Sequence, residues 1–455
     1  MLCGSRSGAV FDLILRGGTL IHADGECRAD LAIQGETIAA LLPPDTQAET
    51  RRTLDARGKL LLPGLVDAHA HLREPGLTSK EDFPSGTRAA LAGGVTTVLD
   101  MPTDDPWTVT LEDFAAKRAL AGGRIHVDVG LQVALGRQSP AELRALVAAG
   151  AVSFEIFTAD VPPAFLHADA ATVEAAMRRV AEAGGRVCVS PGDQSMLMAR
   201  LAALVPGRST PAEFAATRPP LAEAMGIARA LVAAAAIGCP VHVRQINSAA
   251  GLAVWRRLRD IADASVETTP QNLFFTVADY ERPDGALLKA APPLRQPADR
   301  AALRAALGEG LIDMVATDHA PHLPAEKCAF PADFASVPGG LPGLQTLLPA
   351  MLRLVADHVL TLPGLVAACA ANPARRFGLA AKGRLAPGAD ADVLVLDPRG
   401  TWTVTDMDQY SKAGATPFAG MSVPFALERV LLRGVEVLAP DGAIAPPRGR
   451  VLGPA

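Results

Sequence analysis

Two histidines at the end of an apolar segment are the first residues in the chain that point to chemistry. The motif DAHAHLREPG, residues 67–76, sets His69 and His71 two positions apart, and a β-strand directs such side chains toward one face. Two imidazoles on one face can share a metal ion, since zinc commonly takes histidine nitrogens. The apolar residues before the pair and the Gly/Pro turn after it favour a metal-binding strand end over an ordinary surface loop.

A carboxylate follows a second apolar segment, DMVATDHAPH at residues 313–322. We expect a strand here that delivers Asp318 to the site, with His322 in the turn beside it. One oxygen of Asp318 can bind a metal while the other accepts a proton from an attacking water. A capping role is the alternative, and the neighbouring histidines favour chemistry. Arg73, at the end of the first motif, suits recognition of a carboxylate, with a salt bridge to Glu74 as the alternative.

Strands that alternate with helices must position these residues. Short apolar runs alternate with Ala-rich segments through the middle of the chain, which is typical of parallel β/α units and favours a closed α/β barrel of the (β/α)8 type. Both ends of the chain have short alternating runs with Gly turns, typical of β hairpins. We predict a β-sandwich from residues 1–62 and 386–455 around a barrel at 63–385. The expected strands include 95–101, 127–133, 152–157, 187–190, 241–246 and 313–317, and the helices 141–149, 170–183, 220–236 and 299–307.

Composition excludes several classes of protein. The 455 residues are 49% hydrophobic and 20% charged, which is enough for a large core and too apolar for a disordered chain. A net charge of −5 without a basic block argues against a nucleic-acid partner. No apolar run approaches the ~20 residues of a membrane span and no secretory signal is evident, so a cytoplasmic protein is expected. Six widely spaced cysteines without a CxxC pair indicate free thiols.

Taken together, the motifs resemble those of the dihydroorotase, allantoinase and dihydropyrimidinase group of amidohydrolases, and those of dihydroorotase most closely. The resemblance runs nearly end to end. It implies a metal-dependent (β/α)8 barrel with a β-sandwich built from both termini, and hydrolysis of a cyclic amide. The motifs that carry it are DxHxHLREPG (67–76), KxxPPLR (289–295), TDHAPH (317–322), NPARRFGL (372–379), KGRLAPGADAD (382–392) and SKAGATPFAG (411–420).

The resemblance is incomplete at the metal ligands. The family holds two metals with HxH, a carboxylated lysine that bridges them, two further histidines and an aspartate. The HxH pair and Asp318 match, but Glu155 stands at the lysine position, and Ser190 and Gln245 stand at the positions of the other histidines. Ser190 and Gln245 are poor zinc ligands, so the pattern favours one divalent ion, expected to be zinc. The predicted ligands are His69, His71, Glu155 and Asp318.

The role of Glu155 stays open at this point. A glutamate reaches less far than a carboxylated lysine, so direct binding requires a shift of the metal or the strand, or an intervening water. The alternative is a buried, hydrogen-bonded carboxylate.

The predicted substrate contacts are also altered. The resemblance implies that a substrate carboxylate is held by an arginine, by the asparagine of an MPNT turn and by the second histidine of DHAPH. Arg73 and His322 match, but Thr103 replaces the turn asparagine and Ala291 the asparagine before PPLR, which weakens the case for dihydroorotate itself. His242 lies three positions before residue 245 on an expected strand, so we expect it to face the helices and do not predict it as a ligand.

We predict a mononuclear enzyme that opens a hydantoin-, dihydropyrimidine- or dihydroorotate-like ring, with Asp318 carrying the proton to the leaving nitrogen. The competing hypothesis is an inactive dihydroorotase-like subunit that serves as a structural partner, for example of aspartate transcarbamoylase. Drift after loss of activity would not spare HxH, Arg73 and TDHAPH together, so the enzyme is favoured. The expected partners are a small cyclic amide and further copies of the chain, with no nucleic acid and no membrane.

Activity and metal content should not depend on carbon dioxide. Glu155 offers no amine that could be carboxylated, so the bicarbonate rescue expected of a carboxylated lysine has no target. The check is to measure metal content and turnover of the purified protein with and without bicarbonate at constant pH and ionic strength. A bicarbonate-dependent rise in either quantity would mean that another lysine has taken this role.

Overall fold

Parallel strands close into a barrel in the computed structural model, which describes residues 10–454 apart from residue 331. The predicted α/β barrel is confirmed. Strands β8 and β9 are separated only by Gln132, and a parallel bridge between Ala70 and His319 closes the ring. The barrel strands are β6 (Leu65–Ala70), β7 (Val95–Asp100), β8 (Asp128–Leu131), β9 (Val133–Ala134), β10 (Phe154–Phe157), β11 (Val187–Ser190), β12 (Val241–Val243), β13 (Ala264–Thr268) and β14 (Met314–Val315).

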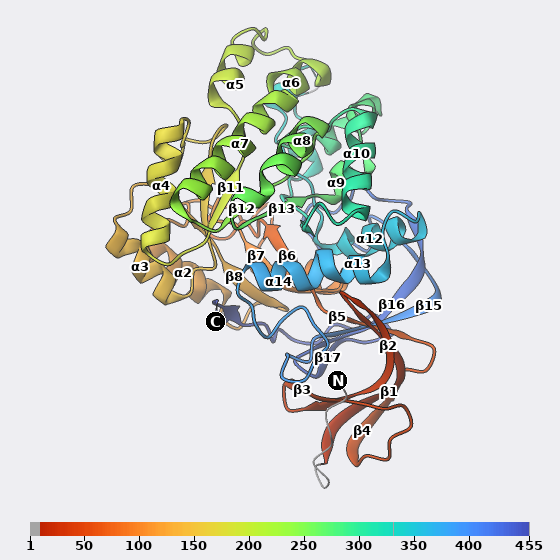
Figure 1. Ribbon diagram of the computed structural model, residues 1–455. Helices are drawn as coiled ribbons and strands as arrows, with labels where there is room; N and C mark the ends of the chain where they lie inside the picture. The colour runs from red at the N-terminus through yellow and green to blue at the C-terminus, as the bar shows by residue number, and fades with distance from the viewer. Residues whose placement is uncertain (1–9, 331, 455) are drawn as a thin grey trace.

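Helices cover the outside of the barrel (Figure 1). They form where apolar residues recur at helical spacing, as on α4, which buries Val173, Ala176, Met177 and Val180. Side-chain caps fix many of their starts, for example Asp169 before α4. The covering helices, which include all four predicted ones, are α1 (Phe83–Ala92), α2 (Leu111–Ala121), α3 (Pro140–Ala149), α4 (Ala170–Glu182), α7 (Pro220–Ile237), α8 (Ala249–Leu258), α10 (Pro297–Gly308) and α12 (Leu347–Ala356).

Shorter helices lie in the connections. Helices α5 and α6 extend the connection between β11 and α7 and project beyond the barrel in Figure 1. An apolar cluster joins residues of β6, β7, β11 and β14, and includes Val66, Leu99, Cys188 and Met314 together with Val152, which precedes β10. The short helices are α5 (Gln194–Leu201), α6 (Pro211–Thr217), α9 (Pro270–Phe274), α11 (Pro324–Lys327), α13 (Leu362–Val366) and α14 (Asn372–Arg376).

Both ends of the chain contribute to a separate β domain, as expected. Its sheet runs in the order β17-β16-β15-β5-β1-β2-β3, with β4 paired to β1. Strand β15 pairs antiparallel with β5, so the C-terminal part continues the sheet of the N-terminal part. The strands are β1 (Phe11–His22), β2 (Gly25–Gln34), β3 (Thr37–Leu42), β4 (Thr50–Asp55), β5 (Leu60–Pro63), β15 (Val393–Thr403), β16 (Ser422–Leu432) and β17 (Val435–Leu438).

The division predicted for residues 386–455 does not hold at its end. Strand β18 (Val451–Leu452) leaves the β domain and pairs in parallel with β8 of the barrel. Because β8 ends the short sheet β8-β7-β6, its outer edge would otherwise present unpaired backbone groups, and β18 covers that edge.

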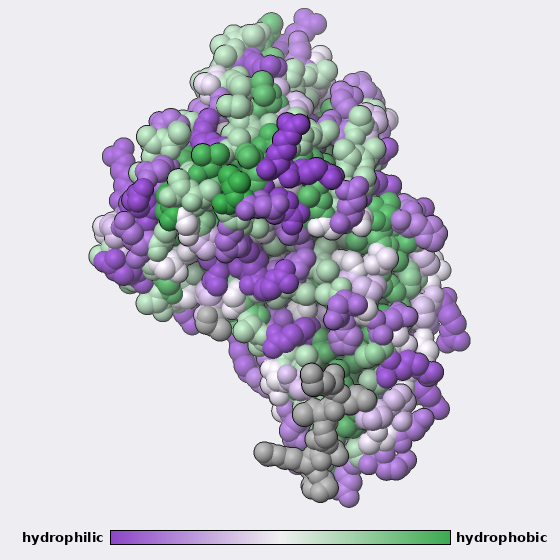
Figure 2. All heavy atoms as spheres, in the orientation of Figure 1, coloured by the Kyte–Doolittle hydropathy of each residue, from purple (hydrophilic) through white to green (hydrophobic). Residues whose placement is uncertain are grey.

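One helical stretch, Pro211–Ile237, is long and apolar enough to cross a membrane by length and composition. The sequence interpretation counted uninterrupted apolar residues and missed it. In the structure α7 packs against α4 and α8, and it buries Ile227, Leu231 and Ala234 as a core helix does. Its exposed apolar residues include Leu221, Met225 and Val232. Figure 2 shows hydrophobic residues at the surface over α7.

The cysteines that the structure describes are free thiols, as predicted. Cys188, Cys239 and Cys369 are buried, whereas Cys27 and Cys328 are exposed. Cys3 lies outside the described residues.

Removal of the Asp128 carboxylate should destabilise the protein strongly. This fully buried group accepts hydrogen bonds from Lys382 and from Arg433, which lies in the β domain. Asp128→Ala leaves buried cations short of a partner, so we expect a loss of about 3–5 kcal/mol in the free energy of unfolding. The measurement is urea denaturation. Glu174→Ala, which breaks an exposed pair with Arg178, is the control and should cost less than about 1 kcal/mol. Equal costs for the two variants would contradict this account of the junction.

Candidate metal centre

Three predicted ligands converge at the carboxyl ends of the barrel strands. His69 lies on β6, His71 follows it, and Asp318 follows β14. The Nε2 atoms of His69 and His71 lie 3.3 Å and 3.2 Å from Oδ1 of Asp318. The three potential ligand atoms all lie within 4.8 Å of one another. Such a group can hold one ion.

Each imidazole is oriented through its other nitrogen. Nδ1 of His69 lies 2.6 Å from Oε1 of Glu267, and Nδ1 of His71 lies 2.7 Å from Oγ1 of Thr103. Partners of this kind fix the ring and leave Nε2 free for a metal. Thr103, predicted as a substrate contact, therefore orients His71.

The donor set fits a divalent cation by its chemistry. Two imidazole nitrogens and one carboxylate oxygen are ligands that zinc prefers in catalytic sites, where a further position stays open. Burial lowers the pKa of His71 to about 3, so its ring is neutral and able to bind. Burial also lowers the pKa of His69, but the carboxylates of Asp318 and Glu267 outweigh it and raise this pKa above its ordinary value. The surroundings of His69 thus carry excess negative charge.

Asp67 joins the two motifs beneath these ligands. Its Oδ1 accepts hydrogen bonds from the backbone N–H of His69 and of Thr317, both at 3.1 Å. Burial raises the pKa of this carboxyl to about 6. Because the bonds go to backbone atoms, Asp67 aligns the strand ends and is not itself within the three-ligand group.

Asp318 is held in position by Gln245. The side-chain amide of Gln245 donates to Oδ2 of Asp318, while Oδ1 faces the two histidines. The backbone φ angles of both residues are positive, 48° at Asp318 and 49° at Gln245, so the chain turns sharply at the two strand ends. These turns bring the side chains together.

The structure does not bring Glu155 into the ligand group. Its Oε2 accepts from Nε of Arg244 at 3.2 Å, and its Oε1 accepts from the hydroxyl of Ser190 at 2.8 Å. The observed state is therefore the alternative left open above, a fully buried and hydrogen-bonded carboxylate.

Two buried residues that the sequence interpretation missed organise the space below the ligands. Arg244 donates from Nη1 to the carbonyl oxygen of Ala68 at 2.9 Å and to Oε2 of Glu267 at 3.2 Å, and from Nη2 to Gln132. Burial raises the pKa of Glu267. The nearby Arg244 and His69 outweigh this effect and hold the pKa of Glu267 well below its ordinary value. The sequence contains a signal for both residues. Arg244 directly follows the short apolar strand Val241–Val243, and Glu267 lies within the next strand, Ala264–Thr268.

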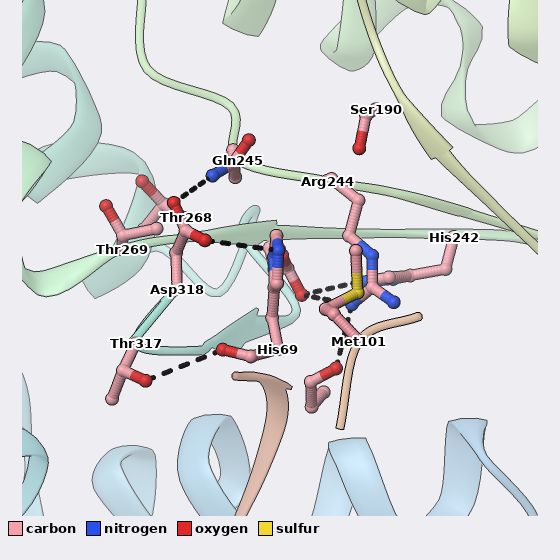
Figure 3. A network of polar contacts seen from close by, with 12 residues as sticks. His69, Met101, Ser190, His242, Arg244, Gln245, Thr268, Thr269, Thr317 and Asp318 are labelled. Atoms are coloured by element: carbon pink, nitrogen blue, oxygen red, sulfur yellow. Dashed lines mark hydrogen bonds and ion pairs between the residues drawn. The ribbon is translucent and has the colours of Figure 1, made fainter. Parts of the chain in front are cut away.

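The prediction that His242 faces the helices is wrong. Its Nε2 lies 2.9 Å from Oε2 of Glu267, and its ring packs against Phe377, which belongs to the apolar cluster inside the barrel. The expected strand ran to residue 246, but β12 ends at Val243, and the turn at Gln245 breaks the alternation on which the prediction relied. Figure 3 shows His242 and Arg244 on one side of His69, and Gln245 and Asp318 on the other.

Arg73 and His322 lie together and are not part of the ligand group, although the charge of Arg73 acts on His71. Nη2 of Arg73 is 3.4 Å from Nε2 of His322, whose Nδ1 is 3.1 Å from Nζ of Lys80. Nε of Arg73 is buried and has no hydrogen-bond partner among the described residues. Burial lowers the pKa of His322 to about 3, which keeps this ring neutral beside the two cations.

A cavity of about 220 Å³ opens above the ligand group. His69, His71 and Asp318 line it, whereas Arg73, Thr103 and His322 do not. Its wall is largely apolar, and the polar groups among the remaining lining residues include Gln245, Glu223 and Arg295. The apolar lining includes Met101, Phe157, Val161, Leu197, Pro219 and Ala222.

Comparison with known proteins decides the family. The family model described as "Amidohydrolase family" matches residues 60–437, which span the barrel and much of the β domain. The chain belongs to the amidohydrolase family. This confirms the resemblance inferred from the motifs, and the ligand group described above lies within the matched residues.

Relatives of this amidohydrolase carry several names. An allantoinase of Rubrobacter xylanophilus is 35% identical over 98% of both chains, and a dihydroorotase of Methanosarcina acetivorans is 34% identical over 95% of this chain and 94% of its own. The solved L-hydantoinase (dihydropyrimidinase) of Arthrobacter aurescens superposes with a TM-score of 0.92 at 31% identity, covering 98% of this chain and all of the other. The allantoinase and the dihydroorotase are thus almost equally identical to this chain, so sequence identity does not favour one activity over the other.

Proposed function

We propose that this amidohydrolase opens the ring of a cyclic amide by hydrolysis of a C–N bond, with a hydantoin-like ureide as the substrate class. The observation that carries the proposal is that His69, His71 and Asp318 converge at the floor of the cavity. The names of the relatives, allantoinase and hydantoinase, support this class of ring.

One divalent ion, held by His69, His71 and Asp318, completes the proposed site. When bound, such an ion supplies Lewis acidity, which polarises an amide carbonyl and lowers the pKa of water. Zinc suits the two nitrogens and one oxygen of this donor set.

Asp318 is the proposed proton carrier. Its Oδ1 faces the histidine pair at the cavity floor, and the hydrogen bond from Gln245 to Oδ2 holds the carboxylate in one orientation. From there it can accept a proton from the attacking water and deliver it to the leaving ring nitrogen. Thr103 and Glu267 act indirectly, because each orients one imidazole.

The apolar part of the cavity wall suits a neutral ring, and the charged lining residues beyond the ligand group carry both signs: Asp160, Asp193, Glu223, Arg218 and Arg295. A ring amide in the cavity faces apolar residues such as Phe157 and Val161, and the amide of Gln245 lies beside Asp318. Arg73 and His322, which the sequence proposed as carboxylate contacts, do not line this space, whereas Arg218 and Arg295 do. The hydantoin class is therefore preferred to dihydroorotate.

An anionic, dihydroorotate-like ring is the second candidate, and Arg73 favours it. This arginine is largely buried, and the structure records no ion pair for it among the described residues. A buried guanidinium with an unpartnered Nε can donate to a ligand carboxylate, although the carboxylates of Asp318 and Asp104 already contribute negative charge nearby. The inactive-subunit hypothesis has less support, because mutations accumulated after a loss of activity would not keep three ligand atoms together at a cavity.

Assembly of several copies of the chain stays a prediction.

Asp318→Asn should nearly abolish turnover. The amide cannot accept a proton from the attacking water, and a general base typically contributes about 10²- to 10⁴-fold. Steady-state kinetics on hydantoin-type substrates measures the effect, and Asp260→Asn, whose side chain is 92% exposed, is the control. Wild-type turnover in Asp318→Asn would assign the proton transfer to another residue.

Arg73→Met should separate the two substrate classes. If a carboxylate binds at Arg73, loss of a charge-assisted hydrogen bond should raise KM for dihydroorotate by about 10- to 100-fold. KM for a neutral hydantoin should change by less than about threefold. Parallel kinetics on both compounds makes the measurement, and an equal change in both KM values would show that Arg73 supports the site only structurally.

A further inference from the structure

Arg244 is a fully buried cation surrounded by oxygen atoms that a divalent metal ion would also accept. Its guanidinium lies between Oε2 of Glu155 and Oε2 of Glu267, each 3.2 Å from a donor nitrogen. The carbonyl oxygen of Ala68, at 2.9 Å, and the side-chain oxygen of Gln132 complete the set. Two carboxylates, a backbone carbonyl and an amide oxygen are typical ligands of hard divalent cations. The guanidinium of Arg244 therefore occupies a position that could otherwise hold a metal cation.

This position is linked to the proposed metal centre through Glu267 and His69. Nδ1 of His69 contacts Oε1 of Glu267, whose other oxygen binds Arg244, while Nε2 of His69 points to Asp318. Figure 3 shows the guanidinium and Asp318 on opposite sides of the imidazole. The two cation positions are thus neighbours across one ring.

The buried charges balance with one divalent ion. Glu155, Glu267 and Asp318 bring three negative charges, and Arg244 brings the positive charge in contact with two of them. Asp67 and Arg73, which also act on these ligands, add one charge of each sign. Two negative charges therefore remain when the imidazoles are neutral, and one divalent ion compensates them. A second divalent ion beside Arg244 would leave uncompensated positive charge in a buried region, which is strongly unfavourable.

We propose that Arg244 acts as a tethered second cation, which occupies the position between Glu155 and Glu267 and restricts the centre to a single metal ion. The inference rests on the proposed function, since it takes His69, His71 and Asp318 as the ligands of that ion. Arg244 is a positioning residue, because it touches the carboxylates and not the reacting atoms.

Removal of the tethered charge should create a second metal site. We expect one tightly bound Mn²⁺ per chain in the wild type and in Arg244→Lys, which keeps a cation. In Arg244→Gln we expect two, the second bound more weakly than the first, because two divalent ions exceed the charge of the three carboxylates by one. In the double variant Glu155→Gln/Arg244→Gln, which removes one charge of each sign, the number should return to one. Isothermal titration with Mn²⁺ and elemental analysis after dialysis give the stoichiometry, and circular dichroism verifies folding.

The outcomes separate the inference from the proposed function. A folded Arg244→Gln variant that binds one ion overturns the role of Arg244 and leaves the proposed function intact. Should Arg244→Gln not fold, saturation of the wild type decides: one ion at excess Mn²⁺, with the electron paramagnetic resonance spectrum of an isolated ion, supports the inference, and a spin-coupled pair overturns it. Wild-type protein that binds no ion contradicts the proposed function itself.

Discussion

The carboxylate of Glu267 is the contact on which the centre of the barrel depends. It is fully buried, and it meets His69 through one oxygen and His242 and Arg244 through the other. An isolated carboxylate at such a depth would be strongly unfavourable, so its three partners have to converge on it from β6, from β12 and from the residue after β12. The orientation of the first metal ligand thus follows from the satisfaction of a buried charge.

The same constraint divides the barrel mouth into two regions with different tasks. On one side of His69, ionic contacts are internal and complete, and they leave nothing for a ligand. On the other side, Asp318 and the Nε2 atoms of the histidines face a cavity with a largely apolar wall. Reactive groups in such surroundings interact more strongly than in water, because fewer solvent dipoles screen them.

The sequence predicted the barrel and the convergence of His69, His71 and Asp318 because these depend on local patterns. Apolar runs of strand length mark the strands, and a strand end carries its side chains to a known edge. It could not predict the partners of Glu155, because a carboxylate that binds a metal and one that binds an arginine look alike in the chain. The orientation of His242 was predicted wrongly for another reason. The backbone of Gln245 has a left-handed conformation, which ends the alternation of side chains that a continuous strand would keep.

The pairing of β18 with β8 has a consequence for the order of events during synthesis. Strand β8 is made early, yet its outer neighbour lies about 320 residues later, and β5 likewise waits for β15. Contacts so distant in the chain form slowly, because a long loop must close before they contribute. As the polypeptide leaves the ribosome from its N-terminus, the outer edge of β8 stays unpaired until the segment that forms β18 emerges.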